Sequence, residues 1–468
     1  MTDSTAVKEK FRDELATVTK EGKRIWIYPK KPSGRFYNYR TLLSILLLVF
    51  LFGAPFIKVN GHPWILLNLL DRKFIIFGIP FGPYDFHLFV LLMISTIVAI
   101  FLFTVVYGRL FCGWICPQTV FMEMVFRKIE YWIEGDYKKQ IALDKAPLDG
   151  RKFIKKFSKH IIFFSISFLI GNTFLAYIIG VDELFKIISD PVSQHFAGFS
   201  AMILFSLIFY YVFARFREQA CTLVCPYGRL QGVMLDQNSI VIAYDNKRGE
   251  PRGPLKKNVE QPDRGDCIDC NQCVDVCPTG IDIRNGTQLE CVNCTACIDA
   301  CDYVMDKIKK PRGLVRYASK NEIDDGVRSV FTARSIAYTV VLILIISLTA
   351  VLMLNRSDFE LTILRTPGLL YQEQPDNKIS NIYDLKIINK TFDTLPAELT
   401  LSNIAGEIKL IGVAPVVKPQ SDAEGKFMVI LSKDQITKLN TPLEIAVSSG
   451  GKTIDVIKTS FLGKVERK

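Results

Sequence analysis

The sequence predicts an α-helical membrane protein with five transmembrane helices, an inserted cytoplasmic cysteine-rich domain and a C-terminal β-sandwich. Three observations predict this architecture. Five apolar runs are long enough to cross a bilayer, eight of the twelve cysteines lie in one short segment, and the C-terminal quarter alternates short apolar stretches with turn residues. A chain of 468 residues exceeds the usual size of one domain, so several units are expected.

The composition supports a membrane protein. Hydrophobic residues make up 49% of the chain and the mean hydropathy is +0.22, which is too apolar for a soluble protein with a polar cysteine-rich segment. The net charge is +11, and residues 355–468 carry 15 Lys and Arg against 14 Asp and Glu, so the excess lies in the first 354 residues. These basic residues cluster in loops between apolar runs, as on a cytoplasmic membrane face. Nucleic acid is not an expected partner, because no basic stripe with interleaved aromatics stands elsewhere.

The five apolar runs cover residues 41–57, 86–107, 161–181, 197–214 and 335–354. Because about twenty helical residues cross a hydrocarbon core of ~30 Å, each run predicts a transmembrane helix in the lipid bilayer. The first and fourth runs are short, which leaves re-entrant or buried helices as an alternative. No cleavable signal is expected, since the first apolar run starts only near Thr41 and lacks a small-residue cleavage site.

Loop charge predicts the orientation. Residues 108–159 hold eleven Lys and Arg, whereas residues 58–84 hold three and residues 182–196 hold one. By the positive-inside rule, the N-terminus, the long second loop and the cysteine-rich insert face the cytoplasm, and the C-terminal domain lies outside. An odd number of spans agrees with this. All twelve cysteines fall in metal-type motifs, which indicates reduced thiols without structural disulfides.

The eight clustered cysteines form two runs with the same spacing. The first run is Cys267-Ile-Asp-Cys270-Asn-Gln-Cys273-Val-Asp-Val-Cys277, and the second is Cys291-Val-Asn-Cys294-Thr-Ala-Cys297-Ile-Asp-Ala-Cys301. This is the bacterial ferredoxin pattern C-x2-C-x2-C-x3-C written twice, so it predicts a two-cluster ferredoxin-like domain with two [4Fe-4S] clusters. The two runs differ in the residue that follows the last cysteine, which is Pro278 in the first run and Asp302 in the second. This difference changes the local turn but not the number of ligands.

The spacing also predicts which cysteines share a cluster. Three thiolates two residues apart hold one face of a cluster, and the fourth cysteine of each run ligates the other cluster. We therefore assign one cluster to Cys267, Cys270, Cys273 and Cys301, and the second to Cys291, Cys294, Cys297 and Cys277. The alternative is a zinc ribbon or a disulfide framework, but zinc sites usually pair two C-x-x-C units across a long loop without the C-x3-C ending.

Two further cysteine pairs follow the second and fourth apolar runs. They read Cys112-Gly-Trp-Ile-Cys116-Pro117 and Cys221-Thr-Leu-Val-Cys225-Pro226. Residues four apart share a helix face, so each pair is expected to direct both sulfurs one way, and each proline to end or kink the turn. The four thiols should then lie near one another, and soft thiolates select Cu(I), zinc or an iron-sulfur cluster. Inert packing cysteines and thiol-disulfide exchange are the alternatives, although redox pairs usually read C-x-x-C.

Histidine is scarce, and no C-x-x-C-H motif exists, so covalent c-type haem is excluded. His87 and His195 begin two spans on the outer side of the membrane. They could together bind a b-type haem or copper, but histidines at such positions more usually lie at the headgroup boundary. Met122 and Met124 follow Cys116, and methionine is more often core filler than a copper ligand.

The C-terminal part predicts an immunoglobulin-like β-sandwich. Alternating runs at 383–388, 397–401, 408–413, 427–431 and 443–447 are separated by turn residues at about the eight-to-twelve-residue spacing of sandwich strands. This part has no cysteine or histidine, so docking or a structural cap is expected there. The predicted domains are a basic cytoplasmic tail at 1–40, a four-helix membrane domain at 41–230, a ferredoxin-type domain at 231–333, a fifth transmembrane helix at 334–354 and an outer, periplasmic β domain at 355–468.

Several stretches together resemble the CcoG/FixG/RdxA family of cytochrome c oxidase accessory proteins. They are residues 112–119 (CGWICPQT), 133–136 (IEGD), 218–229, 248–253 (RGEPRG) and 311–317 (PRGLVRY), with the double ferredoxin run. The ferredoxin run is shared with many redox proteins, whereas the two C-x3-C-P motifs with RGEPRG are much more specific. With the five spans and the outer β domain, the resemblance covers essentially the whole chain.

The resemblance implies a bacterial inner-membrane oxidoreductase, a cupric reductase that converts Cu(II) to Cu(I) on the cytoplasmic side for insertion into a cbb-type oxidase. In that family the paired C-x3-C-P motifs are regarded as the copper or an extra redox site, which maps here to Cys112, Cys116, Cys221 and Cys225 as catalytic and metal-binding residues. Implied partners are copper, oxidase assembly factors or a copper transporter, and a cytoplasmic electron donor or quinol. Two other hypotheses stay open. One is a quinol-oxidising electron-conduit subunit, although a simple conduit needs neither the outer β domain nor the fifth span. The other is a non-enzymatic assembly scaffold.

Overall fold

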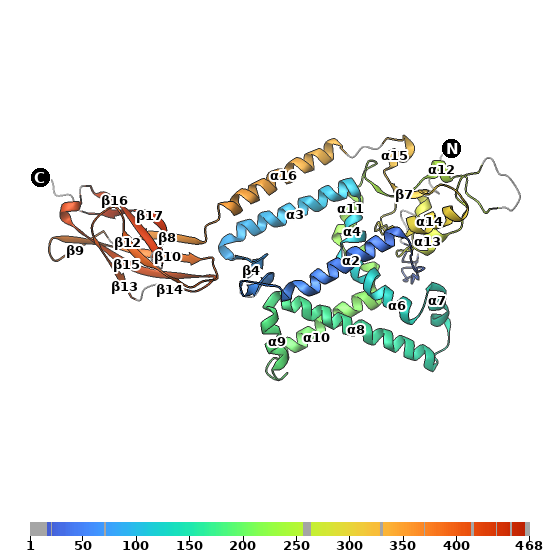
Figure 1. Cartoon of the computed structure of the whole chain (residues 1–468), viewed down its shortest axis with the longest axis horizontal. Coiled ribbons are helices and arrows are strands. Elements are labelled where there is room, and N and C mark those ends of the chain that lie inside the picture. The colour runs from blue at the N-terminus through green and yellow to red at the C-terminus, as the bar shows by residue number, and fades with distance from the viewer. Residues whose placement is uncertain are drawn as a thin grey trace. The chain divides into compact units, whose positions relative to one another are not determined.

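The computed structural model describes residues 16–19, 21–69, 72–255, 264–327, 331–368, 370–412, 416–436, 438–449 and 452–463. Residues 1–15 of the expected basic tail and Val413 of an expected strand lie outside these ranges. The chain divides into two compact units (Figure 1). The first contains residues 1–57 and 91–348, and the second contains residues 58–90 and 349–468.

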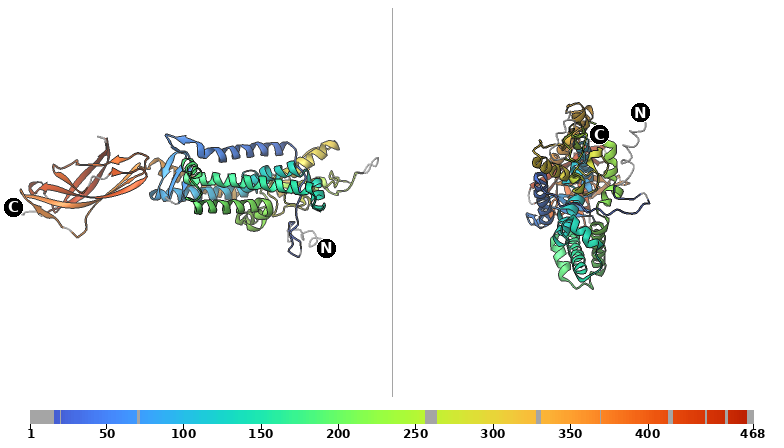
Figure 2. Two further views of the ribbon diagram at one scale, coloured as in Figure 1. Left: turned by 90° about the horizontal axis from the view of Figure 1, so that it is seen from below. Right: turned by 90° about the vertical axis from the view of Figure 1, so that its right-hand side faces the viewer.

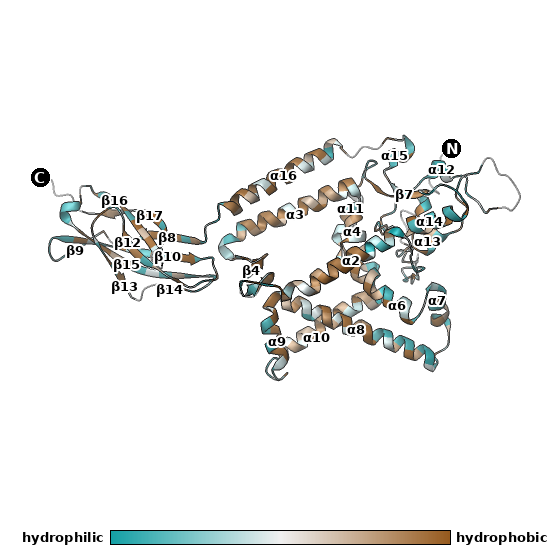
Figure 3. Ribbon diagram, in the orientation of Figure 1, coloured by the Kyte–Doolittle hydropathy of each residue, from teal (hydrophilic) through white to brown (hydrophobic). Residues whose placement is uncertain are grey.

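Five helices among the described residues are long and apolar enough to cross a membrane, and they coincide with the five predicted spans. They are α2 (Arg35–Gly53), α3 (Phe86–Tyr107), α8 (Gly150–Ile179), α10 (Phe196–Tyr211) and α16 (Ala333–Leu354). With their flanking turns, the first and fourth spans reach 22 and 21 residues, so both have the length of a full crossing. Apolar residues run along these helices, and polar residues gather beyond their ends (Figure 3).

Short helices connect the spans of the first unit. They are α4 (Leu110–Trp114), α5 (Pro117–Thr119), α6 (Arg127–Ile133), α7 (Tyr137–Lys145), α9 (Val181–Ser189), α11 (Pro226–Met234), α12 (Asn246–Gly249), α13 (Gln272–Asp275), α14 (Ala296–Lys307) and α15 (Lys320–Asp324). Three further segments, Val120–Phe126, Val212–Phe216 and Ala220–Val224, are π-helical. Such segments are rare and are often found at functional sites.

Aromatic packing fixes the polar ends of three helical segments. Phe126 stacks on Phe213 with the ring centroids 4.7 Å apart, and it meets Phe163 of α8 edge-on at 4.8 Å. Gly171 lets α8 and α10 approach closely, because a side chain there would meet Ser206 Oγ at 3.1 Å. Seen from below, α2 and α8 run along the same direction (Figure 2).

The cysteine-rich region folds around a small antiparallel sheet. Strands β6 (Val241–Tyr244) and β7 (Val315–Ala318) pair with Val241 opposite Ala318, and the eight cysteines lie between the two strands in sequence. Apolar residues from both strands and from α14, such as Ile242, Met305 and Val315, are buried together with four of these cysteines, which are Cys267, Cys273, Cys294 and Cys297. The strand pair therefore closes the cysteine-bearing segment into one core.

The second unit is the expected antiparallel β-sandwich. One sheet has the order β13-β15-β10-β8, with β9 also pairing β10, and the other has the order β12-β16-β17. The strands are β8 (Phe359–Arg365), β9 (Gln372–Gln374), β10 (Lys378–Asn389), β11 (Leu395–Pro396), β12 (Glu398–Leu401), β13 (Glu407–Ile411), β14 (Val416–Val417), β15 (Ser421–Ser432), β16 (Asn440–Ser449) and β17 (Lys452–Leu462). Tyr383 of β10 stacks on Phe427 of β15 at 5.4 Å, and both are fully buried between the sheets.

The loop between the first two spans also belongs to this second unit, which the domain prediction did not include. It contains β1 (Lys58–Val59), β2 (His62–Pro63), β3 (Leu66–Asn68), β4 (Lys73–Ile76) and β5 (Ile79–Phe81). Asp85, which is 1% exposed, joins this loop to the sandwich through Arg356 Nη2 at 2.9 Å and Lys390 Nζ at 3.0 Å. Two cations on one buried carboxylate make this contact specific.

Candidate iron-sulfur and metal centre

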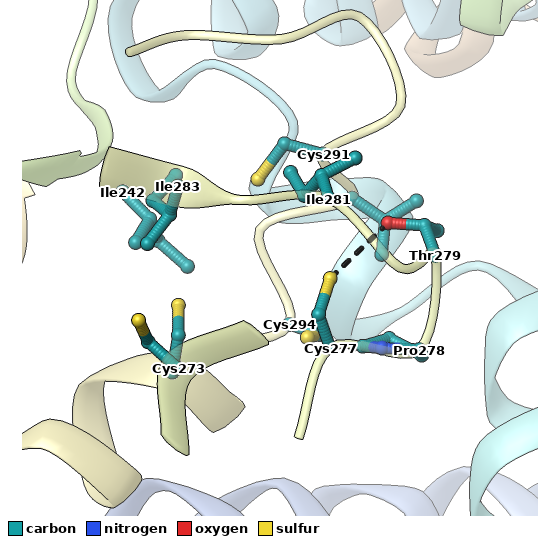
Figure 4. Close-up of a pocket in the computed structure, with 11 residues that line it drawn as sticks. Ile242, Cys273, Cys277, Pro278, Thr279, Ile281, Ile283, Cys291 and Cys294 are labelled. Carbon is teal, nitrogen blue, oxygen red and sulfur yellow. Dashed lines mark hydrogen bonds between the residues drawn. The ribbon is translucent and has the colours of Figure 1, made fainter. Parts of the chain in front are cut away.

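Two cavities in the first unit are lined by the eight ferredoxin-type cysteines. Cys267, Cys270, Cys273 and Cys301 line one cavity, which encloses about 360 Å³ free of protein atoms. Cys277, Cys291, Cys294 and Cys297 line the other, of about 330 Å³, where Cys273 also reaches the wall (Figure 4). The structure thus brings together the same two sets of four that the spacing predicts, including the exchange of Cys277 and Cys301 between the runs.

The geometry of the cavities suits a polynuclear group. All twelve cysteines are free, so the disulfide alternative finds no support. Within the described part of the chain, no three Cys, His, Asp or Glu side chains gather closely enough to hold one metal ion. A zinc ribbon needs four ligands around one ion. The two cavities, of about 360 and 330 Å³, each with four cysteines of one predicted set in the wall, fit an iron-sulfur cluster.

The two cysteine loops have the same backbone conformation. In the first, Asp269 and Asn271 flank Cys270 with φ angles of 52° and 56°, and in the second, Asn293 and Thr295 flank Cys294 with φ angles of 54° and 67°. Asp and Asn tolerate this left-handed conformation better than most residues. Alternation between right- and left-handed residues turns successive backbone N–H groups to one side, where they bind anions. Each loop is thus suited to surround a negatively charged cluster.

Burial makes these cysteines poor acids in the metal-free protein. It raises the pKa of Cys273, Cys291 and Cys301 to about 12 in each case. The thiols are therefore neutral at pH 7, whereas cluster ligands are thiolates. Binding of a cluster must release protons, which couples cofactor loading to pH.

In both C-x3-C-P motifs the proline ends the turn, as expected, and the second cysteine already lies outside that turn. Cys112 lies in α4, but Cys116 precedes α5 with φ −55° and ψ 125°, and Cys225 precedes α11 with φ −65° and ψ 111°. The reason is the following proline, which disfavours a helical conformation in the residue before it and then starts a new helix at its first position. The second cysteine of each motif therefore stands at a break between two helices.

The four thiols of these motifs lie near one another. Burial raises the pKa of Cys221 to about 12, and the thiols of Cys116, Cys112 and Cys225 raise it further through electrostatic repulsion. Burial likewise raises the pKa of Cys112 to about 11, although Gln231 Nε2 donates a hydrogen bond to its sulfur at 3.4 Å. The four thiols are thus half-buried neighbours, and the raised pKa values of Cys112, Cys116 and Cys221 keep those three protonated at pH 7 in the metal-free protein.

The first C-x3-C-P motif packs directly on the second ferredoxin loop. A side chain at Gly113 would stand 2.5 Å from the carbonyl oxygen of Val292 and 2.6 Å from that of Asn293. Only glycine permits this close approach of the two backbones. Arg40 also holds this segment in place, because its Nε donates a hydrogen bond to the Gly113 carbonyl oxygen at 2.7 Å. Arg109 adds a second link by donating to the carbonyls of Leu289 and Gly228. The two types of cysteine motif therefore share one packed core.

A third cavity lies between the second C-x3-C-P motif and the second ferredoxin loop. It contains about 350 Å³ free of protein atoms and is lined by Cys221 and Met122 on one side and by Pro278, Thr279 and Val292 on the other. Pro278 and Val292 are the neighbours of the predicted cluster ligands Cys277 and Cys291. The cavity therefore borders both a membrane-end thiol and the second cluster cavity.

The remaining predicted residues have ordinary surroundings. His195 Nε2 lies 3.1 Å from Asp190 Oδ2, which fits the headgroup-boundary interpretation. His87 is exposed at the start of α3. Met122 and Met124 are 4% and 6% exposed, and Thr41 Oγ1 donates to the Met124 sulfur at 3.9 Å, as expected of core residues.

Sequence reasoning missed a buried ion network beside the third cavity. Arg217 forms two hydrogen bonds to the Glu130 carboxylate, at 3.0 and 2.8 Å, and Lys159 Nζ lies 2.9 Å from Glu134 and 3.7 Å from Glu130. Burial alone would raise the pKa of Glu130, but Arg217, Lys159 and Arg127 together hold it below its usual value. Acidic and basic residues at 123, 127, 130 and 134 share one helical face, and this spacing was the available signal.

Comparison with known proteins adds independent information. Three family models match: "4Fe-4S binding domain" at residues 88–140, "4Fe-4S dicluster domain" at 216–320 and "IG-like fold at C-terminal of FixG" at 349–464. All twelve cysteines fall within the two iron-sulfur matches. The third match agrees with the predicted immunoglobulin-like sandwich.

Curated relatives match over most of the chain. Protein RdxB of Cereibacter sphaeroides is 36% identical over 404 residues, covering 82% of this chain and 83% of the relative. Protein RdxA of the same organism is 32% identical over 93% of this chain and 97% of its own length. Nitrogen fixation protein FixG of Rhizobium meliloti is 35% identical over 64% of this chain and 58% of its own length.

Proposed function

The chain belongs to the FixG and RdxA family of iron-sulfur membrane proteins, and from this premise we propose that it is a metalloreductase. It reduces Cu(II) to Cu(I) on the cytoplasmic side of a bacterial inner membrane. The Cu(I) then serves assembly of a cbb-type cytochrome c oxidase, through assembly factors or a copper transporter that receive the ion.

One observation carries the proposal: the contact of Gly113 with the backbone of Val292 and Asn293. Gly113 lies between the first pair of membrane-end thiols, and Val292 and Asn293 lie between two cysteines of the second cluster cavity. Electron transfer between redox groups needs a short path through packed atoms. This contact supports such a path between a cluster and a metal at the thiols.

The residues of the two ferredoxin runs divide into two ligand sets. We assign Cys267, Cys270, Cys273 and Cys301 to the first cluster and Cys277, Cys291, Cys294 and Cys297 to the second. The bound clusters supply one-electron transfer, and the protein tunes them through burial and hydrogen bonds near sulfur.

The four membrane-end thiols form the reduction site in this proposal. Thiolates of Cys112, Cys116, Cys221 and Cys225 prefer Cu(I) to Cu(II), so they raise the reduction potential of the copper substrate. Because burial raises the pKa of Cys112, Cys116 and Cys221, metal binding releases protons from these three thiols.

The orientation follows from charge. The basic loop between α3 and α8 and the ferredoxin-type region face the cytoplasm in this proposal, and the β-sandwich faces the periplasm. Cytoplasmic thiols are kept reduced, which suits twelve free cysteines.

The test is anaerobic Cu(II) reduction by the purified full chain with its clusters reduced by dithionite. Cluster reoxidation and Cu(I) chelation are followed optically. A variant with all four membrane-end cysteines changed to Ser is compared with a control carrying Thr222→Ser and Leu223→Ile, which leaves every thiol in place. We expect stoichiometric Cu(I) from the native and control proteins and slow reaction of the cysteine variant with unchanged iron content.

Two results would contradict the proposal. Equal rates in all three proteins would remove the role of the four thiols and leave nonspecific reduction by the clusters. No reaction in any of them would favour an electron conduit or an assembly scaffold.

A further inference from the structure

A cavity at the membrane end of α8 and α10 is used by none of the groups assigned so far. It contains about 1040 Å³ free of protein atoms, including space open to the outside. Its walls include Trp26, Tyr28, Asp144, His160, Tyr210 and Tyr211. We propose that this cavity binds a membrane quinol and is the electron entry site of the protein, an inference that rests on the proposed electron-transfer function.

The first argument is the neutral hydrogen-bonding pair in the wall. The hydroxyl of Tyr210 on α10 and Nδ1 of His160 on α8 lie 2.8 Å apart. None of the described residues hydrogen-bonds Nε2 of this imidazole, so the second nitrogen can meet a ligand hydroxyl. A quinol needs an acceptor for each of its hydroxyl protons, and an imidazole held by a phenol supplies one.

The second argument is access from the bilayer. Phe157 and Ile161, which flank His160 on α8, are 55% and 48% exposed. Leu207 and Ile208 on α10, just before Tyr210, are 46% and 57% exposed. Ile161, Leu207 and Ile208 lie in the predicted spans, where exposed side chains face lipid tails, and Phe157 lies one turn before the first of these spans. An apolar ligand with a polar head can therefore reach the cavity from within the membrane.

The third argument is the charge of the wall. Lys156 contacts Asp144 at 2.6 Å and Glu134 at 3.0 Å, and Lys159 contacts Glu134 at 2.9 Å. The guanidinium of Arg215 faces the ring of Trp26 at 5.8 Å. Because both lysines are neutralised by carboxylates, the cavity is a weaker site for an anionic phospholipid headgroup than for a neutral quinol head.

The fourth argument is the link from the cavity to the cysteines. Ile27, next to Trp26, packs against Gly280, where an added Cβ would stand 2.8 Å from Ile27 Cδ1. Gly280 N donates to the carbonyl of Cys277 at 3.2 Å. Trp26 also lies 4.9 Å from the guanidinium of Arg217, which lines the third cavity beside Cys221. Two residues, Ile27 and Gly280, thus connect Trp26 in the cavity wall to Cys277 of the second cluster cavity.

The reaction balances without another reactant. Oxidation of one quinol to the quinone releases two electrons and two protons, and two Cu(II) ions each take one electron to give two Cu(I). His160 accepts one proton. The other proton passes to water at the open side of the cavity.

The test uses the full chain in lipid nanodiscs with oxidised clusters and no copper. Duroquinol is mixed in anaerobically, and bleaching of the visible cluster absorbance gives the rate of reduction. We expect reduction of the native protein, and rates at least about tenfold lower for His160→Gln and Tyr210→Phe, because a general base typically contributes about a hundredfold or more. His195→Gln, a histidine at another helix end, is the matched control and should react like the native protein. Dithionite should reduce every variant equally.

A binding measurement keeps the inference testable if a variant loads its clusters poorly. Duroquinone should quench tryptophan fluorescence saturably, and Trp26→Phe should remove most of that quenching although three other tryptophans remain. Equal rates in all variants would overturn the inference, as would absence of quinol-driven reduction in a protein that dithionite reduces. So would a phosphatidylglycerol molecule that copurifies with the native protein and is lost from the variants. Because no copper is present, these failures are separate from failure of the proposed copper reduction.

Discussion

Gly113→Ala should separate the first C-x3-C-P motif from the second ferredoxin loop. The added Cβ would lie 2.5 Å from the Val292 oxygen and 2.6 Å from the Asn293 oxygen, whereas ordinary contact begins at 3.4 Å. Both neighbours are backbone atoms, so the whole loop must retreat by nearly an ångström. Overpacking of this kind costs about 1–3 kcal/mol. This displacement lengthens the path between the second cluster cavity and the membrane-end thiols, so electron transfer along it should become slower.

The assay is the rate of cluster reoxidation by Cu(II), measured with iron content and thermal unfolding. Gly198→Ala is the matched control, because Gly198 lies in α10 with no atom within 4 Å of an added Cβ, and alanine favours a helix. We expect slower reoxidation and lower stability for Gly113→Ala alone. A native rate in Gly113→Ala with full iron content would refute the claim that this contact carries the electron path.

Three further outcomes are expected. Cys277→Ser and Cys301→Ser should each remove one cluster, so that the iron content falls from about eight to about four atoms per chain. The double variant should lose both clusters, and iron analysis with Mössbauer spectroscopy measures the loss. In the metal-free protein, the rate of Cys112 alkylation should rise about tenfold per pH unit between pH 7 and 10. The reason is that burial raises the pKa of Cys112 to about 11 and that only the thiolate reacts. An alkylation rate that levels off near pH 8 would contradict this effect of burial. Asp85→Ala removes the buried carboxylate that Arg356 and Lys390 share and leaves Lys390 with the exposed Glu360 at 3.4 Å. It should destabilise the β-sandwich unit by about 3–5 kcal/mol in thermal or protease-resistance measurements, whereas Asp422→Ala, which removes a side chain that is 42% exposed, should cost less than about 1 kcal/mol.

Much of the architecture could be predicted because its signals are local. A span is encoded by about twenty consecutive apolar residues, and a sandwich strand by alternation along a few positions. The ligand runs at 267–277 and 291–301 are likewise encoded by fixed spacing, because a loop of two residues sets where the next thiol points. The five spans therefore appear where the sequence placed them, and the five predicted strand runs overlap β10, β12, β13, β15 and β16, whereas β8 and β17 were not predicted. The two predicted groups of four cysteines line two cavities.

The motifs after α3 and α10 show the limit of local reasoning. The pairing of Cys112 with Cys116 was expected on one helical face, yet Pro117 forces the second cysteine out of the helix. The proline was visible, but whether it kinks a helix or begins a new one depends on what the next turn packs against. Here Val120, Phe121 and Phe126 of the following π-helical segment are buried, and that burial fixes the break.

Only the tertiary structure revealed the contacts on which both proposals depend. Gly113 against the second ferredoxin loop, Glu130 with Arg217, and His160 with Tyr210 each join residues fifty or more positions apart. No periodicity encodes such a pair, because its free energy comes from packing that forms after the helices exist. The cysteine spacing was thus determined by the sequence alone, and the contacts from which we propose a route for electrons and protons were decided by the fold.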